Sequence, residues 1–275
     1  MSEHLPRLSI QFPLVTMMAR AALKAARKLV RDFGEVENLQ VSRKGPGDFV
    51  TAADLRAEKI LREELEKAKE GAGFLLEESG EIPAQPGMGR WIIDPLDGTT
   101  NFMHGVPHFA ISMAYEERGQ VIAGLIYNPI TDEMYYAAKG MGAYLNDRRL
   151  RVSARERLPD CLMAASRPHA QAEGSKSFAA ELHKVAVVSS QVAGLRRMGS
   201  ATLDLCYLAA GRYDLYVGLD LSPWDMAAGL LIAREAGAVV TDIYGKDDIF
   251  QTRSIVVANE RVHTTTMALM KKIAA

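Results

Sequence analysis

Residues 91–93, Trp-Ile-Ile, form a short apolar run that leads into two aspartates, Asp94 and Asp97, separated by Pro95 and Leu96. Such a run is typical of a buried strand that delivers acids at its carboxyl end. Pro95 restricts its own φ and biases Asp94 toward an extended conformation, so the turn is stiff and both carboxylates can converge on one point. The feature therefore predicts a buried sheet with acidic side chains at its edge.

The chemistry of this segment points to a cation next to a phosphate. Carboxylate oxygens are the ligands that magnesium and manganese prefer in proteins. Gly98, Thr99 and Thr100 follow as a helix start, where free backbone N–H groups and hydroxyls can hold a phosphate. The alternative is that Asp94 and Asp97 only cap a turn and a helix, since aspartate is favoured at both.

Two further segments place acids at the ends of elements. Glu77 and Glu78 follow the apolar run 74–76, and Asp225 lies in the first turn of a hydrophobic helix that begins near Trp224. Three strand or helix ends that carry carboxylates are hard to explain by capping alone. The pattern therefore favours the metal-site interpretation.

The rest of the chain mixes helical and strand patterns and predicts an α/β fold of the α+β kind. Helical periodicity covers residues 14–34 and 51–70, and the Gly/Pro-rich segment 44–47 between them predicts a flexible loop. The first half continues with strands that predict an antiparallel meander, at 109–115, 121–127 and 133–138. The second half is expected to hold strands at 162–166 and 215–217 and helices at 178–187 and 201–210. With no internal repeat or low-complexity linker, residues 1–275 are expected to form a single domain.

Composition excludes several classes of function. Lysine and arginine total 33 against 34 acidic residues, and the net charge of -1 leaves no basic footprint for nucleic acid or an anionic membrane. The expected partners are therefore small molecules or proteins. Cys161 and Cys206 cannot form a disulfide framework, and no apolar run approaches the roughly 18 residues that span a bilayer. A cytoplasmic protein is expected.

Four segments together resemble the inositol monophosphatase family of magnesium-dependent, lithium-sensitive phosphatases. They are residues 48–54 (Asp-Phe-Val-Thr-Ala-Ala-Asp), 77–79 (Glu-Glu-Ser), 94–102 (Asp-Pro-Leu-Asp-Gly-Thr-Thr-Asn-Phe) and 224–225 (Trp-Asp). The likeness covers nearly the whole chain and leaves residues 1–12 as an N-terminal extension. It implies a layered αβαβα sandwich of the sugar-phosphatase type, a homodimer, and hydrolysis of myo-inositol 1-phosphate or a similar small polyol or sugar phosphate to the alcohol and inorganic phosphate.

The resemblance also implies which residues hold the cations. One Mg²⁺ is expected on Glu77, Asp94 and the Leu96 carbonyl, and a second on Asp94, Asp97 and Asp225. A third, more weakly held ion is expected near Glu77, and Mn²⁺ is an alternative metal. Two such cations can neutralise the phosphate dianion, orient it for in-line attack and acidify a bound water.

For catalysis, the resemblance implies that Asp54, Thr99 and Glu77 assist the attacking water. From its position alone, Asp54 reads as a surface acid near a helix N-terminus. Lys44 falls in the segment that resembles the mobile hairpin of the family. The residues expected to contact the substrate are Asp97, Gly98, Thr99, Thr100, Ala201, Asp220 and Asp225.

The chain departs from the inositol-specific pattern at Gly218. Inositol-specific members carry a glutamate there, seven residues before the aspartate of Trp-Asp, and it binds ring hydroxyls. Either Asp220 reaches the same hydroxyls or the pocket accepts another phosphate ester. Thr100 argues against 3′-phosphoadenosine 5′-phosphate, because phosphatases that cleave it tend to carry lysine there, whereas fructose 1,6-bisphosphate and histidinol phosphate stay open. Arg167 either contacts a second anionic group or is a solvated loop cation.

A function of a different class is a non-catalytic binding role, since some bacterial relatives also serve in transcription complexes. With a net charge of -1, such a role would run through protein contacts. Loss of phosphate release in Asp97→Asn, with the binding role retained, would separate the two classes of function.

Overall fold

The computed structural model describes residues 11–35, 41–45, 48–166 and 176–273, and all structural statements below refer to these residues. The helices are α1 (Pro13–Phe33), α2 (Ala52–Ala68), α3 (Thr99–Met103), the 3-10 turn η3 (Leu158–Asp160), α4 (Lys176–Ser189), α5 (Ala201–Ala209), α6 (Pro223–Glu235), α7 (Ile249–Thr252) and α8 (Glu260–Ile273). The strands of the first half are β1 (Val41–Gly45), β2 (Asp48–Thr51), β3 (Gly73–Leu76), β4 (Gly80–Ile82), β5 (Arg90–Asp97), β6 (Ala110–Glu117), β7 (Gln120–Asn128), β8 (Glu133–Ala138), β9 (Ala143–Leu145) and β10 (Arg148–Arg149). Those of the second half are β11 (Leu162–Ala165), β12 (Gly194–Arg196), β13 (Leu215–Gly218), β14 (Val239–Thr241) and β15 (Ile255–Ala258).

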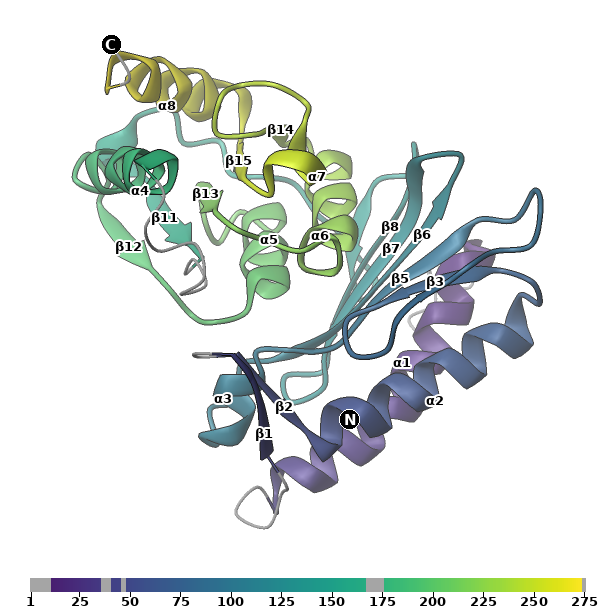
Figure 1. Ribbon diagram of the computed structural model, residues 1–275. Coiled ribbons are helices and arrows are strands. Elements are labelled where there is room, and N and C mark those ends of the chain that lie inside the picture. Colours follow the sequence, from purple (N-terminus) through teal and green to yellow (C-terminus); the bar gives the residue numbers. More distant parts are fainter. Residues whose placement is uncertain (1–10, 36–40, 46–47, 167–175, 274–275) are drawn as a thin grey trace.

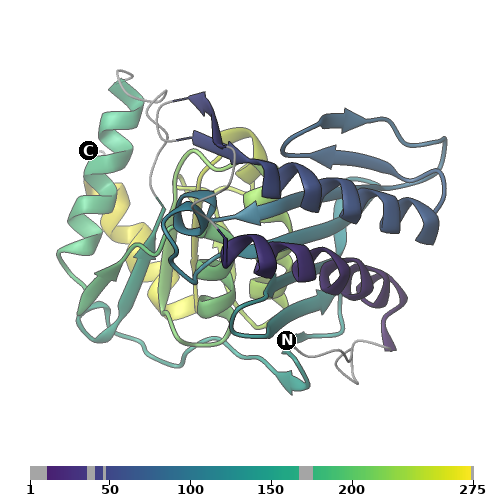
Figure 2. The ribbon, with the colours of Figure 1, turned by 90° about the horizontal axis from the view of Figure 1, so that it is seen from below.

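Five layers stack across the molecule (Figure 1). Helices α1 and α2 lie side by side along one face of the larger sheet, as both views show (Figure 2). Helices α5 and α6 separate this sheet from the smaller one, and α4 and α8 cover the outer face of the smaller sheet. This arrangement confirms the predicted αβαβα sandwich.

The larger sheet has, within the described residues, eight strands in the order β10-β9-β8-β7-β6-β5-β3-β4. Strands β5 to β9 run antiparallel to one another in sequence order, which confirms the predicted meander. Strand β3 joins β5 in parallel, so the carboxyl ends of both strands lie at one edge of the sheet. That edge carries Glu77 and Asp94.

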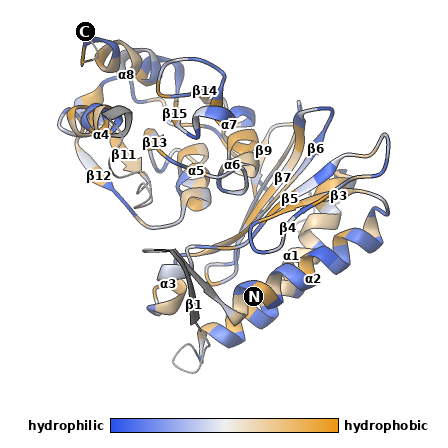
Figure 3. Cartoon of the chain, viewed as in Figure 1, coloured by the Kyte–Doolittle hydropathy of each residue, from blue (hydrophilic) through white to orange (hydrophobic). Residues whose placement is uncertain are grey.

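Both faces of this sheet are buried, which explains the continuous apolar runs of the sequence. Trp91 and Ile93 pack toward α1 and α2, whereas Ile92 between them packs toward α5 and α6. Because successive strand residues point to opposite faces, a strand covered on both sides is apolar throughout rather than alternating. Figure 3 shows this as hydrophobic colour along most of the central strands.

Helix α1 begins one residue after Phe12, which is 8% exposed and contacts the rings of Tyr136 and Tyr144. The last residue of the predicted N-terminal extension therefore belongs to the core. In α2 the buried apolar positions Ala53, Ala57, Leu61 and Leu65 recur every four residues, the spacing of one helix face.

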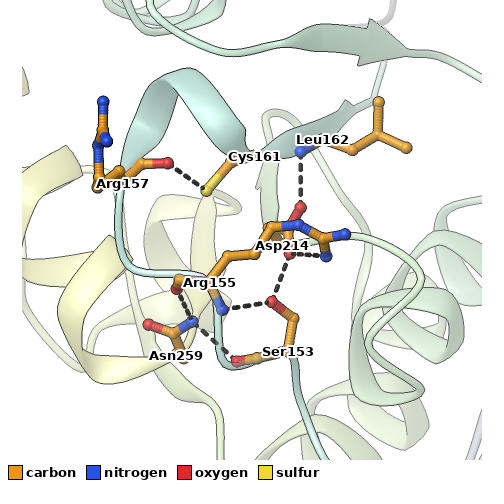
Figure 4. A network of polar contacts seen from close by, with 7 residues as sticks. All are labelled: Ser153, Arg155, Arg157, Cys161, Leu162, Asp214 and Asn259. Carbon is orange, nitrogen blue, oxygen red and sulfur yellow. Dashed lines mark hydrogen bonds and ion pairs between the residues drawn. The ribbon is translucent and has the colours of Figure 1, made fainter.

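The smaller sheet has the order β12-β11-β13-β15-β14 in the described chain, with β15 antiparallel to both of its neighbours. Strands β4, β12, β14 and β15 were not predicted. Asp214, whose side chain is 1% exposed, anchors the connector between β10 and β11 (residues 150–161) to this sheet. Its carboxylate accepts hydrogen bonds from the Leu162 N–H (2.7 Å) and the Ser153 hydroxyl and pairs with Arg155 (3.1 Å; Figure 4). Asn259 donates to two carbonyls of the same connector.

The prediction of a flexible loop at residues 44–47 was wrong for residues 44 and 45, the part of this segment that the structure describes. Residues 41–45 and 48–51 form the antiparallel strands β1 and β2, and residues 46–47 lie outside the described residues. The Phe49-Val50-Thr51 run, with an aromatic and two β-branched residues, favours a strand, and the glycines and proline at positions 45–47 obscured this signal.

Two smaller expectations concern the cysteines and the membrane. Cys161 and Cys206 are buried free thiols. Among the helices that the structure describes, none combines the length and the apolar character that a membrane crossing requires.

Candidate active site

The site is built around a bulge near the end of β5. Asp94 pairs with Ser112 and Asp97 pairs with Ala110. Between these two pairs the chain advances by three residues along β5 but by only two along β6, so β5 carries one extra residue. Pro95, which has no N–H for the ladder, lies in the extra step, and such a bulge re-aims the residues beside it. The carboxylate of Asp94 accepts a hydrogen bond from the Leu96 N–H (2.9 Å), which holds the turn.

Gly98 makes the sharp change of direction from β5 into α3. Its φ is 99°, in the left-handed region that favours glycine. A Cβ there would lie 3.0 Å from the carbonyl oxygen of His108 and 3.2 Å from Cβ of Phe109. The chain can therefore begin α3 directly after Asp97 only because residue 98 has no side chain.

Asp54 lies at the N-terminus of α2 and is 0% exposed, so its interpretation as a surface acid was wrong. One oxygen accepts hydrogen bonds from the N–H (2.8 Å) and the hydroxyl of Thr51, closing a capping box. The other accepts a hydrogen bond from the hydroxyl of Thr99 (3.1 Å), 45 residues further along the chain. The structure thus brings together Asp54 and Thr99, two of the three residues expected to assist catalysis.

Glu77 is the third, and it follows β3 beside Asp94. Its N–H donates to the Ile93 carbonyl (3.2 Å), and its side chain is hydrogen-bonded to Asp94. The turn after it is anchored by Glu58 of α2, which is 2% exposed and accepts hydrogen bonds from the Glu78 N–H (2.9 Å) and the Ser79 hydroxyl. Sequence reasoning missed Glu58, although it lies four residues after Asp54 on the buried face of the same helix.

Asp97 faces the N-terminus of α5, on the other side of the site. One of its oxygens accepts three hydrogen bonds, from the hydroxyl of Ser200 (2.6 Å) and from the N–H (2.8 Å) and hydroxyl (2.6 Å) of Thr202. Ala201 is the first residue of α5, between these two donors. Ser200 and Thr202 were also missed, because 103 and 105 residues separate them from the aspartate and only the Ser-x-Thr helix start marks them.

Asp225 is held at the N-terminus of α6. Its carboxylate accepts a hydrogen bond from the Ser222 N–H (2.7 Å) in a second capping box. The helix starts of α2, α5 and α6 therefore each donate to one of the predicted site acids.

Burial, and to a smaller extent neighbouring charges, raise the pKa values of three of these acids. Burial is the main reason that the pKa of Asp94 lies well above its usual range, and the charges of Glu77, Asp97 and Asp225 raise it further. Burial and the charge of Asp97 raise the pKa of Asp225 to about 7. Burial also raises the pKa of Asp54, although its hydrogen bonds from Thr51 and Thr99 lower it. The carboxyl groups of Glu77, Asp97 and Asp225 thus lie close enough to Asp94 to repel it, and burial leaves this repulsion poorly screened by water.

This donor set fits a divalent cation. Among the described residues, no group of three or more acidic, histidine or cysteine side chains is arranged to hold a metal ion. Asp94, Asp97 and Asp225 instead accept hydrogen bonds from nearby N–H groups. The oxygen-only chemistry and the mutual repulsion around Asp94, which is 2% exposed, are nevertheless what a hard cation would relieve.

The structure also describes three further residues of the expected site, Thr100, Leu96 and Asp220. Thr100 is exposed on α3, and the Leu96 carbonyl accepts a hydrogen bond from the Thr99 hydroxyl (3.1 Å). Asp220 lies on the loop before α6 and pairs with Arg253 (3.1 Å). The side chain of Lys44 and the whole of Arg167 lie outside the described residues, so their expected roles are not tested.

Comparison with known proteins gives consistent results. The family model described as "Inositol monophosphatase family" matches residues 12–275. The chain is 50% identical over 259 residues to an inositol-1-monophosphatase of Mesorhizobium japonicum, an alignment that covers 94% of this chain and 96% of the relative. It is 43% identical over 249 residues to the Nus factor SuhB of Vibrio cholerae, covering 90% and 92% of the two chains. The crystal structure of the extragenic suppressor protein suhB from Bartonella henselae superposes with a TM-score of 0.89 at 50% identity, covering 94% of this chain and 98% of that one.

Proposed function

Because the chain belongs to the inositol monophosphatase family and is therefore a phosphatase, we propose that it hydrolyses a small polyol or sugar phosphate, such as myo-inositol 1-phosphate, in a Mg²⁺-dependent reaction. The observation that carries the metal dependence is the group of mutually repelling carboxyls around Asp94. Oxygen ligands of this kind suit Mg²⁺, with Mn²⁺ as the alternative.

The proposed ligands are Glu77, Asp94 and the Leu96 carbonyl for one ion, and Asp94, Asp97 and Asp225 for a second, with a third ion near Glu77. When bound, such cations neutralise the phosphate charge and acidify a water molecule. The N–H groups of Gly98, Thr99 and Thr100 are proposed to bind the phosphate oxygens at the start of α3, and Asp97, Ala201, Asp220 and Asp225 complete the substrate contacts.

Asp54 and Thr99 are proposed to handle the proton of the attacking water. Since the Thr99 hydroxyl donates to Asp54, its oxygen lone pairs are free to accept a hydrogen bond from a water aimed at phosphorus. The water forms the new P–O bond, its proton passes through Thr99 to Asp54, and the P–O bond to the alcohol breaks as the departing oxygen takes a proton from solvent water. Burial raises the pKa of Asp54, so its carboxylate is a stronger base than that of an exposed aspartate and accepts the proton more readily. Glu77 is proposed as the second group that orients this water.

We also propose a cytoplasmic, lithium-sensitive homodimer in which residues 1–275 form one domain. The buried free thiols are in keeping with a reducing compartment. The single-domain proposal is supported by α5 and α6, which pack against both sheets, and by the Asp214 network that ties the connector to β11.

The test is release of inorganic phosphate by the purified chain in Mg²⁺, with Asp97→Asn as the inactive control. The substrates are inositol 1-phosphate, fructose 1,6-bisphosphate, histidinol phosphate and 3′-phosphoadenosine 5′-phosphate. Preference for inositol 1-phosphate supports the proposal, and preference for another ester keeps the mechanism but changes the substrate. Absence of release from all four would refute it.

The second candidate function is a non-catalytic role in a transcription complex, favoured by the relatives named Nus factor SuhB. Co-purification of the transcription machinery with tagged wild-type chain and with Asp97→Asn tests it. Equal co-purification by both would mean that the binding role does not need catalysis.

A further inference from the structure

Glu58 on α2 is a buried carboxylate that the proposed reaction does not use. It is 2% exposed and lies beside the core residues Ala57 and Leu61 on the buried face of the helix. Among the described residues no ion pair neutralises it, and its oxygens accept hydrogen bonds instead, Oε2 from the Glu78 N–H (2.9 Å) and Oε1 from the Ser79 hydroxyl. Burying a carboxylate without a countercharge costs free energy unless its oxygens are hydrogen-bonded. These two hydrogen bonds therefore account for a carboxylate at this buried position.

The segment that Glu58 holds is the turn between β3 and β4, which begins with Glu77. On one side of this turn the Glu77 N–H donates to the Ile93 carbonyl of β5 (3.2 Å), and on the other side Glu58 accepts hydrogen bonds from the next two residues. The Glu77 side chain, between these two anchors, is hydrogen-bonded to Asp94. A shift of the turn relative to α2 would therefore move the Glu77 carboxylate.

One turn earlier on the same helix, Asp54 holds the start of α3 through the Thr99 hydroxyl (3.1 Å). Residues four apart lie on one face of a helix that rises 1.5 Å per residue, so Asp54 and Glu58 lie about 6 Å apart along α2. Hydrogen bonds close a ring around this part of the site, in the order Glu58, Glu77 (through its turn), Asp94, Leu96, Thr99 and Asp54. One turn of α2 therefore joins the anchor of Glu77 to the anchor of Thr99.

We propose that Glu58 is a positioning residue that fixes the Glu77 carboxylate relative to the Asp54–Thr99 pair. In the proposed function, on which this inference rests, Glu77 binds metal and orients the attacking water, while the pair accepts the proton of that water. Glu58 acts through its hydrogen bonds to the turn and not on the reacting atoms, as the outer partners of metal ligands do. One turn of α2 thus sets the spacing between the two groups that act on the same water.

The test measures metal binding and turnover separately. Binding of Mn²⁺ alone to the purified chain is followed by the electron paramagnetic resonance signal of the free ion, and kcat by phosphate release from inositol 1-phosphate at saturating Mg²⁺. We expect Glu58→Ala to weaken Mn²⁺ binding and to lower kcat by about tenfold each, because outer partners of metal ligands have effects of this size.

Glu58→Gln distinguishes the hydrogen bonds from the charge. Its amide oxygen can accept from the Glu78 N–H, and its NH₂ can donate to the Ser79 hydroxyl, so both contacts to the turn survive. We expect this variant to recover the Mn²⁺ affinity and kcat to within about threefold of wild type, since the turn is still held.

Two further variants separate positioning from a loss of stability. Ser79 is exposed, so Ser79→Ala removes one of the two hydrogen bonds without opening a cavity in the core, and it should weaken Mn²⁺ binding by about threefold. Glu58→Ala combined with Glu77→Gln should be no worse than Glu77→Gln alone, because Glu58 acts through Glu77. A residue that only stabilised the fold would give additive losses.

The matched control is Glu235→Ala. Glu235, the last residue of α6, holds a turn in the same way, because its two oxygens accept hydrogen bonds from the N–H groups of Gly140 and Gly142 (2.7 Å each). It lies at the end of α6 opposite Asp225. Its loss should lower the unfolding midpoint in urea but leave the Mn²⁺ affinity within about twofold of wild type, since distant sites act independently.

The outcomes distinguish this inference from the proposed function. A folded Glu58→Ala chain with the Mn²⁺ affinity and kcat of wild type would overturn the inference, and so would additive losses in the double variant. Glu58→Gln as impaired as Glu58→Ala would overturn it too, because the charge would then matter and not the hydrogen bonds. If Glu58→Ala does not fold, an unchanged Mn²⁺ affinity in Ser79→Ala overturns it. Failure of the wild-type chain to release phosphate would refute the proposed function, whereas the Mn²⁺ affinities would still decide the positioning role.

Discussion

Replacing Asp54 by asparagine should abolish most activity while leaving the fold intact. Asp54 makes two separate sets of contacts: one oxygen accepts from the N–H and hydroxyl of Thr51, and the other accepts from the Thr99 hydroxyl. Asparagine has only one acceptor oxygen. Because Thr51 offers two donors, the amide oxygen should stay with Thr51 and the amide NH₂ should face Thr99.

This orientation reverses the hydrogen bond on which the proton transfer depends. In the wild type the one hydrogen of the Thr99 hydroxyl has two acceptors at 3.1 Å, Asp54 and the Leu96 carbonyl. In the variant the hydroxyl would accept from Asn, and its hydrogen would be left to the Leu96 carbonyl alone. The hydroxyl could then no longer pass a proton to residue 54. Loss of a positioned proton acceptor costs about 10²- to 10⁴-fold in kcat, equivalent to about 2.7 to 5.4 kcal/mol in the barrier.

The stability of the same variant should change little. The capping box keeps its acceptor, so the free energy of unfolding is expected to fall by less than about 1 kcal/mol, whereas Asp54→Ala leaves the buried Thr51 N–H and hydroxyl without this acceptor, which costs about 1–3 kcal/mol. Initial rates of phosphate release at saturating Mg²⁺ and urea unfolding curves measure the two effects. Asp32→Asn, which alters a buried α1 aspartate paired with Arg56 (2.7 Å), is the matched control outside the site. An Asp54→Asn enzyme within about tenfold of wild type in kcat would refute the proposed role of the hydrogen bond.

Three further predictions concern charge, pH and packing. Asp97→Asn should lower kcat by about 10²-fold or more, measured as phosphate release, since one ligand oxygen is lost. The raised pKa values of Asp94 and Asp225 mean that the folded state binds more protons than the unfolded chain between about pH 4 and 7, so stability without metal should fall as pH rises through this window. Thermal scans should then show a larger increase in Tm on adding Mg²⁺ at pH 8 than at pH 5.5, and an equal increase at both would contradict the argument. Gly124→Ala should cost about 1–3 kcal/mol in urea unfolding, because the new Cβ would lie 3.0 Å from Cα of Ala228 in α6; Gly34→Ala, at a helix end with φ of -70°, is the neutral control.

The sequence was informative where structure is local. The apolar run 91–93 and the two aspartates after it predicted a buried strand with acids at its end, because burial on both faces and the proline turn are properties of neighbouring residues. The helix starts at Pro13 and Thr51 were predictable for the same reason. Periodicity and capping chemistry act over one or two turns, so one sequence suffices to detect them.

The sequence was uninformative where the fold joins distant segments. Nothing in the spacing of Asp54 and Thr99, or of Asp97 and Thr202, indicates a hydrogen bond between them, and without the family resemblance Asp54 reads as a surface acid. The short strands β12, β14 and β15 gain their partners only in the folded chain, and each is three or four residues long. Such segments carry too little periodic signal to be separated from loops.

The arrangement of the acids explains how the chain tolerates a group of charges that repel one another. Asp54, Asp97 and Asp225 each accept backbone N–H hydrogen bonds at a helix start, of α2, α5 and α6 respectively. A helix N-terminus carries partial positive charge from its free N–H groups, and this offsets part of the repulsion among the carboxylates. The same contacts that stabilise the helices therefore position the site, which means that an alanine substitution removes the acceptor of a helix-start N–H and a functional group together. Asparagine substitutions, which can keep this acceptor, are the changes that separate the contribution of these residues to the fold from their contribution to the reaction.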